Sequence, residues 1–219
     1  MTQLFTGSIA RRLYALIIVF AIGFASVLAY QLYTLRENLD AFKRTELQSV
    51  VEGATSIAQN YYDRFQAGEF TEEEAKSLAL ESLRGFRYQG KEYVFIDTFD
   101  MVMLMHPTKP EKQGSDRSIE QDGRGKLYIK EMVTNAKANG STFVTYLFKS
   151  PDGGEFDKIS YAQAFEPWGW TIASGVLTTQ VDAIFAEAAM ISGAIAFGVT
   201  LLLLLIGIMI ARSISKPIA

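Results

Sequence analysis

Two long apolar runs without a charged residue lie near the two ends of this chain. The first extends from Leu13 to Leu35 and the second from Ala188 to Ala211. A helix of about 20 residues crosses a hydrocarbon core roughly 30 Å thick. We therefore predict transmembrane helices at residues 13–35 and 188–211. The first run exceeds the apolar core of a signal peptide, and no small-residue cleavage site precedes "RENLD", so we expect it to be retained.

Basic residues flank both runs on the sides that face away from the middle of the chain. Arg11 and Arg12 precede the first run, and Arg212 and Lys216 follow the second. Because cytoplasmic segments carry the excess of lysine and arginine, both ends are predicted to be cytoplasmic. The expected organisation is a cytoplasmic N-terminus (1–12), a first span (13–35), an outer domain (36–187), a second span (188–211) and a C-terminal cytoplasmic segment (212–219).

The outer domain opens with helical patterns. Apolar residues recur every three or four positions between residues 50 and 65, which predicts an amphipathic helix over residues 36–66 that continues the first membrane helix. The stretch "TEEE" then places Thr71 and Glu74 at capping-box spacing, so a second helix should begin there and end near Gly85. Its expected buried face consists of four residues, Ala75, Leu78, Ala79 and Leu83.

From Tyr88 the apolar pattern changes to a period of two. The stretches "EYVFID" and "MVMLMH" are separated by the short turn "TFD", which predicts a hairpin. Residues 107–125 are rich in proline, glycine and charge and are typical of a long surface loop. A helix over "KLYIKEMVTNAKANG" and strands over "STFVTYLF", "DKISYAQAF" and "GWTIASGVL" should follow. Grouped helices and a run of antiparallel strands favour an α+β fold.

Charge and composition narrow the functional classes. All 24 acidic residues lie within residues 36–187 together with 17 of the 21 basic ones, so the outer domain has a formal charge of −7. Such a domain repels phosphates, and we expect no nucleic-acid partner. There is no cysteine and one histidine, which excludes disulfides and the usual zinc sites. Phosphate-loop, nucleophile-elbow and calcium-loop motifs are missing from the sequence, so we expect neither enzymatic activity nor a cofactor.

Polar residues among apolar neighbours are the remaining candidates for chemistry. Lys158 alternates with apolar residues in a predicted central strand, where it either meets an anion or extends to solvent at a strand edge. His106 ends a strand before Pro107 and is either a ligand contact or a strand-end residue. Arg87 is a second candidate cation. Three tyrosines are either cavity walls with hydroxyl donors or core residues: Tyr93, Tyr146 and Tyr161. A cavity built from these groups would suit a short anion with a brief apolar tail.

Five motifs of the outer domain, in order, resemble the single Cache sensor domain of bacterial transmembrane receptors. They are Y-x-F-I-D, M-H-P, D-G-x-G, K-x-S-Y and P-W-G-W-x-I-x-S-G. The stretch "ARSISKPI" resembles the opening of a HAMP linker, at residues 212–219. This resemblance implies a PAS-like antiparallel sheet of about five strands, a parallel homodimer through the long N-terminal helix, and a bacterial inner membrane with residues 36–187 in the periplasm. Methyl-accepting chemotaxis proteins commonly combine these parts, as do sensor histidine kinases and cyclases, and each carries a cytoplasmic signalling module that is not present in this chain.

The resemblance also implies a ligand. Domains of this type often bind small carboxylates such as acetate, propionate, pyruvate or lactate. The motifs of the dicarboxylate and amino-acid sensors of related Cache types are not found in this sequence, which favours a C2 or C3 monocarboxylate. Two alternatives remain: the domain docks a periplasmic binding protein, or it is a structural anchor whose fold has lost its cavity. In an ideal strand His106 and Met103 face opposite sides, so both fit one site only if a β-bulge intervenes. Carried to this chain, the carboxylate partners would be His106 and Lys158, the hydroxyl donors or walls Tyr93, Tyr146 and Tyr161, the residues beside the tail Phe95 and Met103, and a further cation Arg87.

Overall fold

The structure of the protein is a computed structural model that describes residues 9–150 and 153–214. It divides into two compact units, one made of residues 41–180 and the other of the segments before and after them. Helix α1 (Ile9–Gln66) belongs to both units and is continuous, as predicted. The predicted cytoplasmic segments at residues 1–12 and 212–219 lie mostly outside the described residues.

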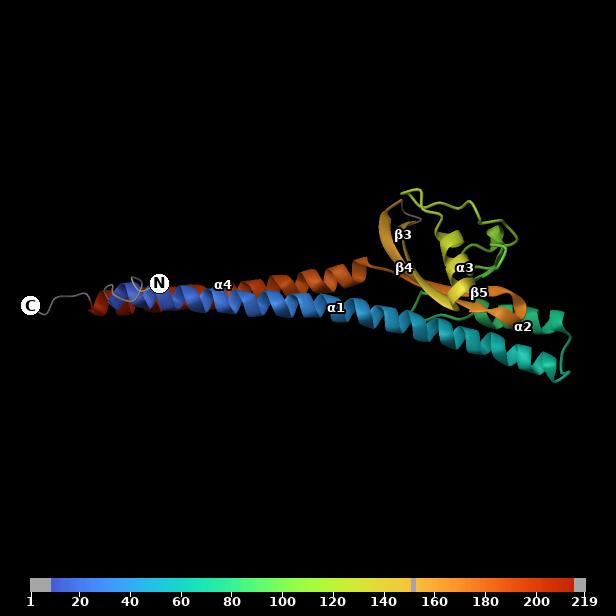
Figure 1. Cartoon of the computed structure of the whole chain (residues 1–219), viewed down its shortest axis with the longest axis horizontal. Helices are drawn as coiled ribbons and strands as arrows, with labels where there is room; N and C mark the ends of the chain where they lie inside the picture. The colour runs from blue at the N-terminus through green and yellow to red at the C-terminus, as the bar shows by residue number, and fades with distance from the viewer. Residues whose placement is uncertain (1–8, 151–152, 215–219) are drawn as a thin grey trace, which may run out of the picture. The chain divides into compact units, whose positions relative to one another are not determined.

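The unit formed by the two ends of the chain contains α1 up to Asp40 and α4 (Thr179–Ile214) from Val181 onward (Figure 1). Both helices are long and apolar enough to cross a membrane. The most apolar stretch of α1 is 0% buried and that of α4 is 6% buried, whereas a core helix of a soluble protein is mostly buried. Within this unit Arg36 of α1 forms an ion pair of 2.8 Å with Asp182 of α4. At Gly207 the two helices are so close that a Cβ atom would lie 2.3 Å from Ile17 Cδ1.

The second unit contains a five-stranded sheet in the order β2-β1-β5-β4-β3. All neighbouring strands are antiparallel. The α+β, PAS-like architecture predicted from the sequence is thereby confirmed. The strands are β1 (Val94–Thr98), β2 (Met103–Met105), β3 (Ser141–Lys149), β4 (Glu155–Phe165) and β5 (Trp170–Leu177), and two short 3-10 turns are η2 (Pro110–Lys112) and η3 (Glu166–Trp168).

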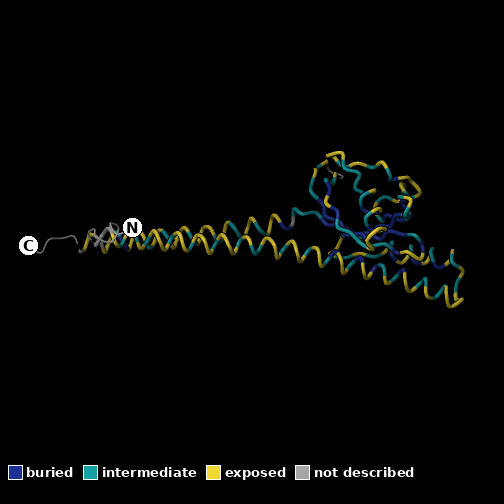
Figure 2. The backbone as a smooth tube through the Cα atoms, viewed as in Figure 1, coloured by how far each residue is buried: buried dark blue, intermediate teal, exposed yellow. Residues whose placement is uncertain are grey.

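The two faces of the sheet are covered by different helices (Figure 1). The second half of α1 and α2 (Glu72–Arg84) pack on one face, with a core that includes Leu47, Val51 and Ile96. Helix α3 (Tyr128–Asn139) packs on the other face, around Phe95 and Met132. Buried residues gather in the sheet and in the helices on both sides of it (Figure 2). Side chains that alternate along a strand therefore face either the α1 and α2 side or the α3 side.

Local signals placed most elements correctly. The capping box is present, because the Glu74 amide donates to Thr71 Oγ1 and the Thr71 amide donates to the Glu74 carboxylate. Gly140 ends α3 with a φ of +83°, a backbone conformation that glycine adopts without strain. The expectation for Leu78 was wrong. It is 39% exposed, because α2 buries only the narrow line of Ala75, Ala79 and Leu83.

Candidate ligand-binding site

A cavity of about 340 Å³ opens at the end of the sheet where β1 begins and β5 ends. Its walls come from the residues just before β1, the segment after β2, and the ends of β3, β4 and β5. They include Tyr93, Thr108, Lys109, Phe148, Lys158 and Leu177. Segments far apart in the sequence thus meet around one space.

Lys158 brings a sheltered positive charge to this cavity. It lies in β4 opposite Tyr146 of β3 and Leu177 of β5, and it is only 7% exposed. Its Nζ lies 4.6 Å from the centre of the Phe148 ring and 5.6 Å from that of Tyr93. Burial lowers the pKa of the ammonium group to about 8, which leaves it largely protonated at neutral pH. No hydrogen bond or ion pair to this ammonium group exists among the described residues, so the cavity favours an anion.

Gly175 makes room for the lysine side chain. It lies on β5 directly opposite Ser160. A Cβ atom at this position would lie 2.9 Å from Lys158 Cε and 2.1 Å from Ser160 Oγ. The absence of a side chain on Gly175 is therefore what allows the lysine stem to cross this part of the sheet.

His106 lies one layer behind the wall of the cavity. Its ring packs against Tyr93, with 5.0 Å between ring centres, and is stacked on Phe95 at 5.8 Å. Nδ1 lies 3.3 Å from the Thr108 hydroxyl. Burial, together with the nearby charge of Lys109, lowers the pKa of the imidazole to about 3, so the ring is neutral at physiological pH. A neutral imidazole at this place can orient Tyr93 and Thr108 and can offer a hydrogen bond.

A β-bulge brings Met103 and His106 to the same side of the sheet. The pairing of β1 with β2 runs from Ile96 with Met105 directly to Asp97 with Met103, which leaves an irregularity between them. Directly paired residues share a face, so Met103 lies on the side of Asp97, toward α3. His106, next to Met105, contacts Phe95 on that side as well. The intervening bulge that the two candidates required is therefore present.

Tyr146 is buried beside the cavity rather than in its wall. Its hydroxyl lies 3.2 Å from Ser160 Oγ, and its ring stacks on Tyr128 with 4.2 Å between centres. It lines a second space of about 340 Å³ that shares Lys109 and Phe148 with the first. Tyr146 is the cross-strand neighbour of Lys158, so its buried ring packs beside the lysine on the same face of the sheet.

Of the eight candidates, Tyr93 and Lys158 line the cavity. Phe95 and Met103, which were expected beside the ligand tail, are buried and do not line it. Tyr161 and Arg87 lie away from it. Tyr161 lies on the opposite face of the sheet, in the core shared with α1 and α2, and its ring contacts Phe143 at 4.7 Å. Since Lys158 and Tyr161 are three positions apart in one strand, they face opposite sides. Arg87 is exposed, and its guanidinium group donates to the carbonyls of Arg84 and Phe86 at 2.8 Å. We therefore leave both residues out of the candidate site.

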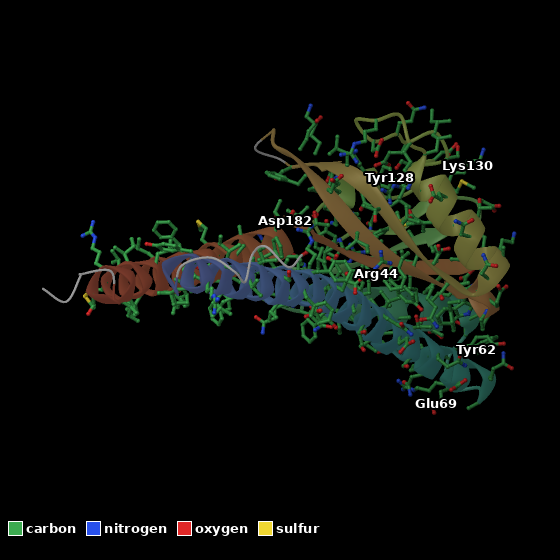
Figure 3. All side chains as sticks on the ribbon, turned by 60° about the vertical axis from the view of Figure 1, so that its left-hand side comes forward. Arg44, Tyr62, Glu69, Tyr128, Lys130 and Asp182 are labelled. Atoms are coloured by element: carbon green, nitrogen blue, oxygen red, sulfur yellow. The ribbon has the colours of Figure 1, made fainter. Side chains whose placement is uncertain are left out.

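The long loop contributes a buried ion-pair network that the sequence pattern did not indicate. Arg117, 6% exposed, donates to both carboxylate oxygens of Asp97 at 3.0 and 3.2 Å and to Glu120 at 2.8 Å. The Tyr128 hydroxyl, at the start of α3, donates to Glu120. Burial raises the pKa of Asp97 to about 6 even though Arg117 opposes that shift. The network ties the loop to β1 and to α3, where Tyr128 lies (Figure 3).

This fold and this cavity define a PAS-like sensor domain that encloses a small, positively charged site. A family model described as a Cache domain matches residues 26–191. The chain belongs to the Cache domain family.

Curated relatives include receptors and a kinase. The methyl-accepting chemotaxis protein McpP of Pseudomonas putida is 34% identical over 220 residues, which cover 100% of this chain and 40% of McpP. The sensor histidine kinase MctS of Rhizobium johnstonii is 28% identical over 157 residues, or 71% of this chain and 32% of MctS. The chain thus spans two fifths or less of the length of these relatives.

Two solved structures share both sequence and fold with the chain. A periplasmic sensor domain of a chemotaxis protein is 37% identical with a TM-score of 0.60, and the match covers 63% of this chain and 96% of that domain. A Cache chemosensory domain, solved as a structural basis for carboxylic acid recognition, is 37% identical with a TM-score of 0.61 and covers 64% of this chain and 97% of its own.

Proposed function

We propose that this chain is the ligand-sensing and transmembrane signalling part of a bacterial chemoreceptor, and that it binds a small carboxylate in the periplasm. The ligands we expect are C2 or C3 monocarboxylates such as acetate, propionate, pyruvate or lactate. The observation that carries the proposal is the Lys158 ammonium group, which is sheltered in a cavity and without a partner among the described residues. The similarity to a domain that recognises carboxylic acids supports the same ligand class.

The remaining walls suit an acid with a short tail. The carboxylate would bind the ammonium group of Lys158, and Tyr93 and Thr108 would supply hydroxyl groups beside it. Phe148 and Leu177 would contact the apolar end. His106, Phe95 and Tyr146 hold these groups in place from behind, and Met103 fills the adjacent core.

Calorimetry on the whole 219-residue chain in detergent micelles tests this proposal. Propionate should bind, and Lys158→Met, which keeps an unbranched stem but removes the charge, should weaken binding about 10- to 100-fold, the usual worth of a charged hydrogen bond. Lys130→Met is the matched control, because Lys130 lies on the exposed surface of α3 (Figure 3) and should leave the affinity unchanged. Flat titrations with all four acids, or an unchanged affinity in Lys158→Met, would contradict the proposal.

The placement in the membrane can be tested separately. We propose spans at residues 13–35 and 188–211 with residues 36–187 in the periplasm, supported by the two membrane-length helices. Because the chain has no cysteine, single cysteines at Lys130 and Arg212 can be labelled in intact spheroplasts with an impermeant maleimide. Labelling of the first position alone is expected, and labelling of the second from outside would reverse the orientation.

Signalling would follow from paired helices. We propose a homodimer through residues 36–66 of α1, in which the bound acid favours one of two arrangements of the helices. Ser56 lies on the exposed side of α1, so disulfide formation by Ser56→Cys in membranes would report a nearby second copy. An absence of cross-linking at every exposed position of this helix segment would contradict a dimer of this kind.

A sensor kinase is the second candidate, because MctS matches 71% of the chain. The two outputs differ in the cell. Loss of swimming toward propionate after deletion of the gene would support a chemoreceptor. Loss of a propionate-dependent phosphorylation of a response regulator, with swimming unchanged, would support the kinase.

A further inference from the structure

An ion pair joins the two membrane-length helices at one end of their apolar segments. Arg36 of α1 follows the uncharged run of residues 13–35, and its guanidinium group lies 2.8 Å from the carboxylate of Asp182 in the first turn of α4. The same guanidinium group lies 5.3 Å from the centre of the Phe185 ring, about one turn further along α4. Among the ion pairs of the described residues, this one alone links α1 with α4.

Arg36 has a second acceptor on its own helix. Its Nε lies 3.9 Å from a carboxylate oxygen of Asp40, one turn further along α1. Glu37, the next residue in the sequence, already accepts a hydrogen bond from the Tyr33 hydroxyl. Arg36 can therefore leave Asp182 and still be paired with Asp40, because residues four positions apart are neighbours on a helix surface. This second acceptor lowers the cost of separating Arg36 from α4.

The contact between Arg36 and Asp182 is weak enough to be reversible. Their side chains are 44% and 50% exposed. Ion pairs of this exposure change an equilibrium by a factor of only about two to five. A contact of this strength favours one of two helix arrangements without making the other inaccessible.

A close contact of the same two helices lies toward the other end of the apolar segments. A Cβ atom on Gly207 of α4 would lie 3.8 Å from Ile17 Cγ1 of α1. Both helices are continuous between this contact and the ion pair. A movement of α4 along α1 that separates Arg36 from Asp182 therefore also moves Gly207 past Ile17, by about 1.5 Å for each residue of displacement.

We propose that Arg36 is a reversible lock between the two membrane helices. Paired with Asp182, it holds α4 at one position along α1, and paired with Asp40 of its own helix, it leaves α4 free to move. This inference goes beyond the proposed function, since it assigns a role to a residue far from the cavity in the sequence. It rests on the proposed placement in the membrane and not on the identity of the ligand.

A disulfide between the two helices measures the position of α4. Ile17→Cys and Gly207→Cys are combined in the 219-residue chain, which has no cysteine of its own, and the chain is oxidised in membrane vesicles. Disulfides form when two Cβ atoms lie about 3.5–4.5 Å apart, so a displaced α4 should react more slowly. Arg36→Gln and Asp182→Asn should each slow the reaction about two- to fivefold, and the two together no more than either alone. The exchanged pair, Arg36→Glu with Asp182→Arg, should restore the rate.

Glu37→Gln is the matched control, because Glu37 is next to Arg36 but is bonded by Tyr33, and it should leave the rate unchanged. Asp40→Asn removes the competing acceptor, so its rate should equal or exceed that of the parent chain. The inference is overturned if the parent pair of cysteines forms no disulfide, or if Arg36→Gln and Asp182→Asn leave the rate unchanged. A failure of the exchanged pair to restore the rate would also overturn it. Because no carboxylic acid enters this experiment, such results would leave the proposed ligand class unaffected.

Discussion

Adding a methyl group to Gly175 tests how Lys158 is held in the cavity. A Cβ atom at this position would lie 2.1 Å from Ser160 Oγ and 2.9 Å from both the Ile159 carbonyl oxygen and Lys158 Cε. The Ser160 hydroxyl can rotate away, at the loss of its contact with Tyr146. The Ile159 carbonyl belongs to the backbone of β4 and moves only if the strand moves. The lysine stem must shift as well.

The size of the effect follows from these contacts. Overpacking of a buried site costs about 1–3 kcal/mol, and the lost hydrogen bond adds about 1 kcal/mol. Gly175→Ala should therefore lower the free energy of unfolding by about 2–4 kcal/mol and the Tm by about 5–10 °C for a unit of this size. Because a charged hydrogen bond depends on geometry, the displaced ammonium group should also weaken propionate binding about 10-fold. Differential scanning fluorimetry and calorimetry on the 219-residue chain measure the two quantities.

Gly53→Ala is the control for this experiment. Gly53 lies on the exposed side of α1, and a Cβ atom there would meet nothing within 4 Å. Since alanine favours a helix, this variant should gain up to about 1 kcal/mol of stability. A Gly175→Ala variant with the Tm and affinity of the wild-type chain would refute the close packing. A lowered Tm with unchanged affinity would show that Gly175 does not position Lys158.

Three further predictions follow from charge and capping. Carboxylate affinity should be constant from about pH 5 to 7, because His106 stays neutral, and should fall about 10-fold per pH unit above about 8 as Lys158 loses its proton; a transition near pH 6.5 in calorimetry would contradict this. Arg117→Met leaves buried Asp97 unpaired and should cost about 3–5 kcal/mol in urea unfolding, and a loss below about 1 kcal/mol would contradict it. Thr71→Ala should cost only about 1 kcal/mol in the same assay, and a loss as large as that of Arg117→Met would contradict a purely local cap.

The fold was predictable because its signals are local. A change of apolar period from about 3.6 to 2 depends on neighbouring residues, and it marked the passage from the helices to the sheet. The capping box of Thr71 and Glu74 involves residues three positions apart, and it placed the start of α2. The prediction that Leu78 is buried was wrong, because helical spacing indicates which residues share a face but not how much of that face the neighbouring elements cover.

The site was predictable where the strand pattern itself carried the signal. A lysine that alternates with apolar residues in a central strand indicated a buried cation, and Lys158 is one. The same two-residue period assigns Tyr161 to the other face, so strand geometry alone argues against it. Arg87 precedes β1, outside the alternating pattern of the strand, so no periodicity relates its side chain to the cavity. The network of Arg117 and Asp97 joins residues 20 positions apart through a loop without periodicity, and no local pattern connects them.

The segment before β1 joins the cavity to α1 across the sheet. Tyr93, a wall residue, accepts a hydrogen bond of 2.6 Å at its carbonyl from the Ser174 hydroxyl, and the Tyr88 hydroxyl lies 2.8 Å from that same oxygen of Ser174. Since the Ser174 proton is used on Tyr93, the Tyr88 hydroxyl is the donor. One residue further, Gln89 donates to Glu46 of α1. A ligand that displaces the backbone of Tyr93 must therefore either break these hydrogen bonds or move Tyr88 and Gln89 with it, and the second course transfers the displacement to the helix.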